Sequence, residues 1–500
     1  MVAAMTSLGA TFIPHSEFSK TRQNAMNVVV IVLDEAPLFP LLKTDGTINA
    51  SRFPGFAALA TSSTWYRNTL GTAQRTTEAV PAILDGRWPT FKNYPYLKDH
   101  PNNLFTLLKD HRALDVYQSI THLCPKKICP NAPPAVEKTL ENQVKQLRRT
   151  IKNATTSKEP TLHFSHVLLP HRPWGLVPDL RQVPQIQRKA DPRPISDPER
   201  RQDNYQSFLR QFVATDTLIE ELVTTMKESK KWDDSLVIVT ADHGITFVPG
   251  ETYRDKINIQ RPETLEDIYR IPLFVKYPNQ KSARISDCPS SSIDILQTII
   301  GVTDVKPKWK TEGTDLSRSC PTRSSRVVRW PKGQISMSTD FSSVLKRVSF
   351  YNSWINANGD VDDIYRVGQS GKLLGQDVPS IAVQRQGMRW DLNSPEKFQR
   401  IGTGEFAEIV GGASGKLFTE QNICRKCEGL IAFNGKFVGV ITELAGVKPS
   451  KNGKYFSSPL MTRLMTPGPA TVEMWIANWT KATPVFTRVG VPRNTPKITP

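Results

Sequence analysis

Long hydrophobic runs are missing from this chain of 500 residues. No stretch reaches the roughly eighteen apolar residues of a membrane-spanning helix, and the mildly apolar start lacks the basic residues that open a secretory signal. We therefore expect no signal peptide and no transmembrane helix in the chain as given. A membrane segment upstream of this start would reconcile that expectation with membrane association. Hydrophobic residues still make up 38% of the sequence, which is enough for a packed core at this length.

Acidic residues are also in short supply. The 47 Asp and Glu residues are outnumbered by 65 Lys and Arg residues, which gives a net charge of +18. Such a charge suits an anionic partner, for example a phosphate or sulfate ester or an acidic membrane surface, although a solvated basic surface has the same composition. Aromatic residues are not interleaved with the basic ones as in nucleic-acid-binding modules, so we expect no nucleic-acid partner.

Cysteine is scarce, and its placement bears on the compartment. The six cysteines form two close pairs and two single positions: Cys124 with Cys129, Cys424 with Cys427, Cys288 and Cys320. Disulfides, reduced thiols and a zinc site built from the two pairs all remain open. Disulfides are favoured because the first pair has a wider spacing than a zinc knuckle, and they would imply an exported protein.

Two apolar runs stop abruptly in residue types that bind metals. Residues 28–33 precede Asp34, and residues 236–241 precede Asp242 and His243. Continuous apolar runs of this length are typical of strands that are buried on both faces of a parallel sheet. Ligands of such sheets bind beyond the carboxyl ends of the strands. The two runs therefore predict a metal site to which both strand ends contribute.

Strand-like and helix-like segments alternate in the first part of the chain, which predicts an α/β fold with a doubly wound, mostly parallel sheet flanked by helices. Strand-like runs prevail later, where Asn434-Gly435 predicts a hairpin with a type I′ turn. Trp475 and Trp479 are expected in the core of that region. The predicted organisation is a tail (1–26), a catalytic domain (27–302), a linker region (303–345) and a β-rich C-terminal domain (346–500).

A short helix is predicted within residues 75–89, ended by Gly86. Proline fits a helix best in its first turn, so Pro81 predicts that Thr76 lies just ahead of the helix start. Among the histidines, His171 stands between prolines, whereas His166 lies within a strand-like run. We interpret His166 as a core residue, or as one that supports a site without touching the ligand.

Four marks follow one another along the sequence: Asp34, the Thr76 segment that closes with Gly86-Arg87-Trp88-Pro89, Pro170-His171-Arg172-Pro173, and Ala241-Asp242-His243-Gly244. In these marks the chain resembles the alkaline phosphatase/sulfatase superfamily, in particular sulfatase-like hydrolases and the phosphoglycerol and phosphoethanolamine transferases of bacteria. The resemblance covers residues 27–302. It implies an alkaline phosphatase-like fold and a metal-dependent active site.

The resemblance also implies roles for individual residues. The metal ligands would be Asp34, Glu35, Thr76, Asp242 and His243. Thr76 would in addition be the nucleophile, with Thr77 as its close rival, and His171 would contact the oxygens of the substrate. Metal binding lowers the pKa of a hydroxyl that is otherwise a poor nucleophile. Glu35 could instead be a solvated or helix-capping acid.

Two departures from the family pattern shape the expected chemistry. Sulfatases oxidise a Cys or Ser to formylglycine, but this chain has Thr76-Thr77-Glu78-Ala79-Val80 at that place, so phosphate esters are favoured over sulfate esters. No histidine follows His243, whereas two-metal relatives have one well after this point. We therefore expect one divalent metal ion per chain (Mn, Zn, Mg or Ca). The cation Arg254 or Lys256 would stand where relatives have the later ligand, and would bind the substrate.

These observations predict a metal-dependent hydrolase or transferase that acts on phosphate esters, in preference to sulfate esters, through a covalent Thr76 intermediate. The resemblance implies an anionic ester substrate, such as an envelope lipid or polysaccharide, and the outer side of a bacterial cell envelope. The alternative is a catalytically degenerate protein that binds anions or the envelope surface.

Overall fold

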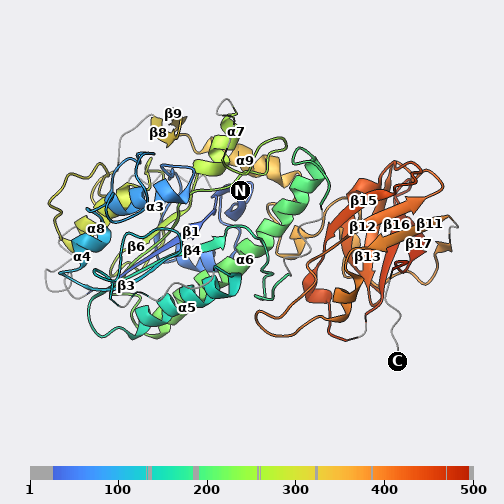
Figure 1. The fold of residues 1–500 in the computed structure, drawn as a ribbon, viewed down its shortest axis with the longest axis horizontal. Coiled ribbons are helices and arrows are strands. Elements are labelled where there is room, and N and C mark those ends of the chain that lie inside the picture. The colour runs from blue at the N-terminus through green and yellow to red at the C-terminus, as the bar shows by residue number, and fades with distance from the viewer. Residues whose placement is uncertain are drawn as a thin grey trace, which may run out of the picture. The chain divides into compact units, whose positions relative to one another are not determined.

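The computed structural model describes residues 26–494 apart from 131, 133–137, 184–190, 256, 257, 259, 260, 321–324, 385, 386 and 469. The chain forms two compact units (Figure 1). Unit 1 comprises residues up to 171 together with 215–246 and 252–348, and unit 2 comprises 172–214, 247–251 and 349–500. None of the described helices combines the length and the apolar composition that a membrane crossing requires.

Unit 1 contains a seven-stranded sheet with the order β3-β4-β1-β5-β6-β2-β7. Its strands are β1 (Val28–Asp34), β2 (Thr64–Tyr66), β3 (Ala113–Gln118), β4 (Thr161–Pro170), β5 (Leu236–Ala241), β6 (Leu273–Lys276) and β7 (Arg284–Ser286). The block β3-β4-β1-β5 is parallel, whereas β6 runs antiparallel to both β5 and β2. The predicted α/β sheet is thus confirmed as a mixed sheet, and its parallel part carries both strand ends that the sequence predicts to bind a metal.

Helices flank this sheet on both sides, and every residue of β1 is therefore buried. The α-helices among the described residues are α2 (Pro54–Ala60), α3 (Thr76–Asp85), α4 (Leu104–Leu108), α5 (Leu140–Thr156), α6 (Pro198–Glu228), α7 (Pro262–Tyr269), α8 (Asp294–Thr303) and α9 (Ser342–Asn352). Alternate residues of β1, Val28, Val30 and Val32, share a buried cluster with α3, α4 and α8. In Figure 1, α3 and α8 lie on one side of the sheet and α5 lies on the other.

A hairpin of β8 (Ser325–Trp330) and β9 (Gly333–Ser338) occurs within the region 303–345, for which the sequence predicted a linker. Val328 and Met337, one from each strand, are buried against Leu70 and Tyr269 of the same unit. These two buried side chains attach the hairpin to the rest of unit 1.

Unit 2 contains two further sheets, with the orders β10-β17-β16-β13-β14 and β11-β12-β15. Their strands are β10 (Val383–Gln384), β11 (Met388–Leu392), β12 (Gly412–Thr419), β13 (Cys427–Phe433), β14 (Lys436–Ile441), β15 (Lys454–Pro459), β16 (Val472–Asn478) and β17 (Val485–Gly490). Asn434 and Gly435 have φ angles of 48° and 77°, which confirms the predicted hairpin turn. Trp475 and Trp479 are buried, as predicted for core residues.

All six cysteines are paired in disulfides, Cys124–Cys129, Cys288–Cys320 and Cys424–Cys427. The favoured interpretation is therefore confirmed, and the alternative of a zinc site built from the two close pairs is excluded.

Unit 2 also buries a cluster of charged groups around Arg193. Its guanidinium lies 2.6 Å from Asp203 Oδ2, 2.8 Å from Asp191 Oδ2 and 3.3 Å from Glu443 Oε1. The Arg193 guanidinium thus forms ion pairs with all three carboxylates. Burial, reinforced by the charges of neighbouring acids, raises the pKa of Asp203 to about 7 and that of Glu443 to about 8, although Arg193 opposes both shifts.

These raised pKa values predict a pH-dependent stability. Both carboxyl groups bind protons more tightly in the folded protein than in the unfolded chain, so the free energy of unfolding should fall as the pH rises from about 5 to about 8. Asp203→Asn removes one of these groups and should weaken the dependence, by on the order of 1–2 kcal/mol over this range. Thermal melts at a series of pH values test this, with the exposed Asp377→Asn as the control in the same unit. An unaltered pH dependence in Asp203→Asn would contradict the expectation.

Candidate active site

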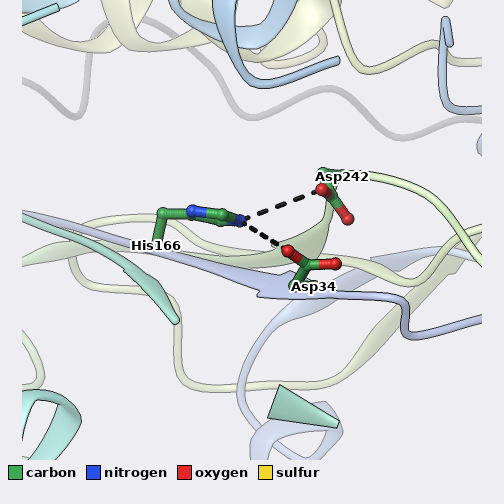
Figure 2. Close-up of side chains that lie close together, drawn as sticks. All are labelled: Asp34, His166 and Asp242. Atoms are coloured by element: carbon green, nitrogen blue, oxygen red, sulfur yellow. Dashed lines mark ion pairs between the residues drawn. The ribbon is translucent and has the colours of Figure 1, made fainter. Parts of the chain in front are cut away.

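Three buried side chains meet at the carboxyl ends of the parallel strands β1, β4 and β5 (Figure 2). Asp34 ends β1, Asp242 follows β5, and His166 lies in β4 opposite Val32. His166 Nε2 is 3.5 Å from Asp34 Oδ2 and 3.8 Å from Asp242 Oδ2. One ligand atom from each residue lies within 4.8 Å of the other two, which is close enough for a single metal ion to bind all three.

The two buried carboxyl groups of this cluster would be stabilised in their charged form by a bound cation. Burial, followed by the charge of Asp34, raises the pKa of Asp242 well above its usual range. Burial alone would also raise the pKa of Asp34, but the contact with His166 and nearby histidine charges hold it below its usual range. Within the described part of the chain, Asp34 Oδ1, Asp242 Oδ2 and His166 Nε2 have no hydrogen-bond partner. Unpaired buried acceptors of this kind are costly unless a cation binds them, so the residues fit a divalent metal ion.

His243 completes the ring of polar groups around the cluster. Its Nε2 lies 3.4 Å from Asp242 Oδ2 and 3.9 Å from Asp34 Oδ1, while Nδ1 lies 3.0 Å from the carbonyl of Gly244, to which it can donate. Burial and the charge of Arg254 lower the pKa of His243 to about 3, so the ring is neutral. Its Nε2 lone pair accepts from Arg254 in this structure and could bind a metal ion in place of that hydrogen bond.

Glycine is required directly after His243. A Cβ on Gly244 would lie 2.2 Å from the carbonyl oxygen of Asp267 and 2.8 Å from Pro37 Cβ. This close approach of backbones fixes the turn that follows β5 and hence the direction of the Asp242 and His243 side chains.

Thr76 is the first residue of α3, and its hydroxyl faces the cluster. The helix starts there because Arg75 is extended, and it ends at Gly86, whose φ is 63°. Thr76 Oγ1 donates to Asp34 Oδ2 at 3.2 Å and lies 3.4 Å from His243 Nε2. Thr77 instead donates to Glu78 Oε2 at 2.6 Å. Of the two rival threonines, Thr76 is therefore the one that contacts the cluster.

The predicted start of this helix was wrong. Thr76 belongs to the helix instead of preceding it, and Pro81 lies inside α3, beyond the first turn. Proline in that position lacks the N–H that would bond to the preceding turn. The helix persists because Pro81 and the residues after it up to Asp85 are buried, so packing outweighs the missing bond.

Arg254 places a positive charge beside His243, Glu35 and His171. Its guanidinium lies 2.6 Å from His243 Nε2, 3.1 Å from Glu35 Oε1 and 3.2 Å from His171 Nε2. Burial would lower the pKa of Arg254, but the charges of Glu35 and Asp34 raise it, so the side chain stays a cation. The arrangement can bind the oxygens of an anionic ester next to Thr76.

The other predicted site residues have different surroundings. Glu35 is fully buried with a φ of 60°, and its carboxylate faces Arg254 and His171 and is not part of the cluster of Asp34, His166 and Asp242. Lys256 lies outside the described residues.

His166 is the residue that sequence reasoning missed. Its burial agrees with the interpretation as a core residue, but its ring touches two carboxylates at the centre of the site. The available signal was a histidine in a strand that is otherwise largely apolar near its end. The pairing of β4 with β1 places His166 opposite Val32, two residues before Asp34. The local sequence does not specify this pairing, so it could not identify His166 as a site residue.

The sulfatase family model matches residues 26–305, which is more than half of the chain. The chain belongs to the sulfatase family. This confirms the predicted alkaline phosphatase/sulfatase superfamily, and membership supports an ester hydrolase with a divalent metal. No curated protein matches the sequence significantly.

Solved structures with a similar fold include enzymes of two kinds. A 2-O GAG sulfatase shares 12% identity with a TM-score of 0.47, over 63% of this chain and 81% of that one. A phosphonate monoester hydrolase of Agrobacterium radiobacter shares 15% identity with a TM-score of 0.44, over 62% and 82%. The phosphonate monoester hydrolase from Silicibacter pomeroyi shares 17% identity with a TM-score of 0.41, over 61% and 79%.

Proposed function

We propose that this sulfatase-family protein cleaves phosphate esters through a covalent intermediate on Thr76. The observation that carries the proposal is the position of the Thr76 hydroxyl, 3.2 Å from Asp34 Oδ2 and 3.4 Å from His243 Nε2, at a cluster of buried carboxylates and imidazoles. A nucleophile beside metal-ligand residues and the cationic Arg254 is the arrangement that phosphoryl transfer requires.

In this proposal, different residues bind the metal, orient the nucleophile and bind the substrate. Asp34, Asp242, His243 and His166 would hold one divalent cation (Mn, Zn, Mg or Ca), which would lower the pKa of the Thr76 hydroxyl and offset negative charge on the ester. Asp34 Oδ2 accepts the hydrogen bond of Thr76 Oγ1 and so orients the nucleophile. Arg254 and His171 bind the ester oxygens that do not react. The group on Thr76 then passes to water in a hydrolase or to an alcohol in a transferase.

The preference for phosphate rests on the identity of the nucleophile. Threonine cannot be converted to the formylglycine that sulfatases make from Cys or Ser, and the sequence around Thr76 has no such residue in register. A threonine alkoxide that attacks phosphorus breaks the bond to the ester's alcohol, which leaves, and the phosphoester formed on Thr76 can be cleaved by a second attack from water or an acceptor alcohol. Sulfate esters are therefore the less favoured substrates.

A panel of chromogenic esters tests the proposal. Metal-loaded protein is expected to turn over phosphate mono- or diesters faster than the matching sulfate ester. Adding an alcohol as acceptor distinguishes transfer from hydrolysis through the new ester that forms. Faster turnover of the sulfate ester would overturn the phosphate preference.

The second candidate function is that of a degenerate protein that binds anions or the envelope surface. It is favoured by the net charge of +18 and by the absence of any histidine after His243 in the sequence. Metal analysis separates the two candidates. We expect about one divalent ion per chain, and a protein that carries no metal, turns over no ester and binds anionic polymers would be the degenerate one.

Arg254 provides a prediction about substrate binding. Arg254→Ala removes the cation that faces the ester, so kcat/KM should fall by about a hundredfold, because a charged hydrogen-bond donor to the transition state is lost. Metal content should not fall, because the guanidinium is not a metal ligand. Steady-state kinetics with metal analysis test this, and unchanged kinetics would remove Arg254 from the site.

We further propose that the protein works outside the cytoplasm, at a bacterial cell envelope, on an anionic ester of a lipid or polysaccharide. The three disulfides support this, because such bonds persist in oxidising compartments. Non-reducing peptide mapping of freshly isolated native protein should find Cys124 bonded to Cys129. Free thiols at these positions would count against export.

A further inference from the structure

A polar cavity lies along helix α3, and its lining does not include Asp34, His166 or Asp242. It has a volume of about 170 Å³, and its wall combines residues of α3 with the loop that follows the helix. The lining residues used below are Glu78, Asp85, Arg87, Trp88, His100 and Asn102. All of them belong to unit 1.

The part of this cavity around Asp85 lies away from the reacting atoms, although Thr77 and Glu78 line its other end. At about 100° per residue, Glu78 and Asp85 lie roughly 160–180° around the helix from Thr76. Nine residues of helix also separate Asp85 from Thr76, which is about 13 Å along the axis. A group bound near Asp85 is therefore too distant to exchange a proton with Thr76.

Asp85 and His100 form a fixed pair in the wall. His100 Nδ1 lies 2.5 Å from Asp85 Oδ2, and each side chain is 11% exposed. Among the described residues, the buried Asp85 Oδ1 has no hydrogen-bond partner. Burial raises the pKa of Asp85, which the contact with His100 opposes. Because Nδ1 is engaged with Asp85, Nε2 is the atom that His100 can offer to a ligand.

The charged and polar side chains that line the cavity determine which class of ligand it can bind. Glu78 and Asp85 would repel an anion, and the Arg87 guanidinium would repel an ammonium group. A metal ion is not favoured either, since the closely spaced ligand set found among the described residues is that of Asp34, His166 and Asp242. A hydroxyl group both donates and accepts, so it can use carboxylates, Nε2 and the Asn102 amide together.

Aromatic surface accompanies these polar groups. Trp88 lines the cavity, and the Arg329 guanidinium lies 5.5 Å from the centre of its ring. An aromatic ring beside hydroxyl-binding groups suits a ligand with an apolar C–H face and polar edges.

We propose that this cavity, built on the Asp85–His100 pair and Trp88, binds an uncharged polyhydroxylated group such as a sugar unit, at a position distinct from the ester that Thr76 attacks. The site does not depend on the esterase chemistry, so each proposal can fail without the other.

Saturation-transfer NMR with glycerol, glucose and maltotriose as probes tests the proposal on the full chain. We expect at least one of them to bind the wild type. His100→Ala and Asn102→Ala should each weaken that binding by about tenfold, the effect of losing a hydrogen bond to a polar ligand. Asn102 is exposed, so its variant should fold even if the His100 variant does not. The exposed His111→Ala is the matched control and should bind like the wild type.

Three results would overturn the inference: no binding of any probe by the folded wild type, equal binding by wild type and Asn102→Ala, or binding of ethanolamine in place of the neutral probes. Turnover of a small chromogenic ester by Asn102→Ala should equal that of the wild type. Sugar binding without any ester turnover would refute the proposed function alone, and turnover without sugar binding would refute the cavity alone.

Discussion

Replacement of Thr76 by alanine is expected to abolish ester turnover, with a loss in kcat of about a thousandfold or more. The reason is that the Thr76 hydroxyl, which donates to Asp34 Oδ2, would form the bond to the substrate, and alanine has no oxygen that could do so. The protein should remain folded, because the side chain donates one hydrogen bond at the start of α3 and the extended Arg75 that precedes the helix is unchanged. Kinetics of a chromogenic phosphate ester, with metal content and a thermal melt on the same sample, measure this.

Thr77→Ala is the matched control for this experiment. Its hydroxyl is engaged with Glu78 Oε2 and not with the cluster, so turnover should stay close to that of the wild type. If Thr76→Ala retains activity while Thr77→Ala loses it, the two adjacent threonines have been assigned the wrong way round. Retained activity in both variants would refute a threonine nucleophile.

The second large effect is expected at His166. His166→Ala removes one of the three groups whose ligand atoms lie within 4.8 Å of one another, and we expect metal affinity to fall by about a hundredfold. Isothermal titration of the metal-free protein with Mn²⁺ or Zn²⁺ measures this without reference to activity. The variant should also lose the stabilisation that the metal gives to the folded state.

His163→Ala is the matched control, since it removes another buried histidine of β4. His163 Nδ1 lies 2.9 Å from Asp115 Oδ2, and His163 is not part of the metal cluster. Its variant should lose stability but bind the metal as the wild type does. Equal metal affinity in wild type and His166→Ala would show that His166 is a buried structural residue, as the sequence alone favoured.

The contrast between His166 and Asp242 shows what sequence can and cannot predict about this site. Asp242 directly follows an apolar run, and the end of a buried strand is a position that local pattern specifies. His166 lies inside β4, and its role depends on the pairing of β4 with β1, which places it opposite Val32. Register between strands distant in the sequence is fixed by packing, so no local pattern specifies it.

Helix α3 and the hairpin at Asn434-Gly435 show the same division within the fold. The hairpin depends on two adjacent residues with positive φ, which Asn and Gly adopt at low cost, and the prediction was correct. The start of α3 was misplaced because Pro81 opposes a helix locally, while burial against the core of unit 1 sustains it. The pairing of Cys288 with Cys320, 32 residues apart, likewise depends on tertiary contacts.

The central claim is a covalent intermediate on Thr76, and chemical trapping tests it most directly. Metal-loaded protein is quenched in acid during turnover of a chromogenic phosphate diester, digested and analysed by mass spectrometry. The account predicts a phosphate-bearing group on the peptide that contains Thr76, located to that residue by fragmentation and absent from Thr76→Ala. An adduct on another residue, or turnover with no adduct at any quench time, would contradict it.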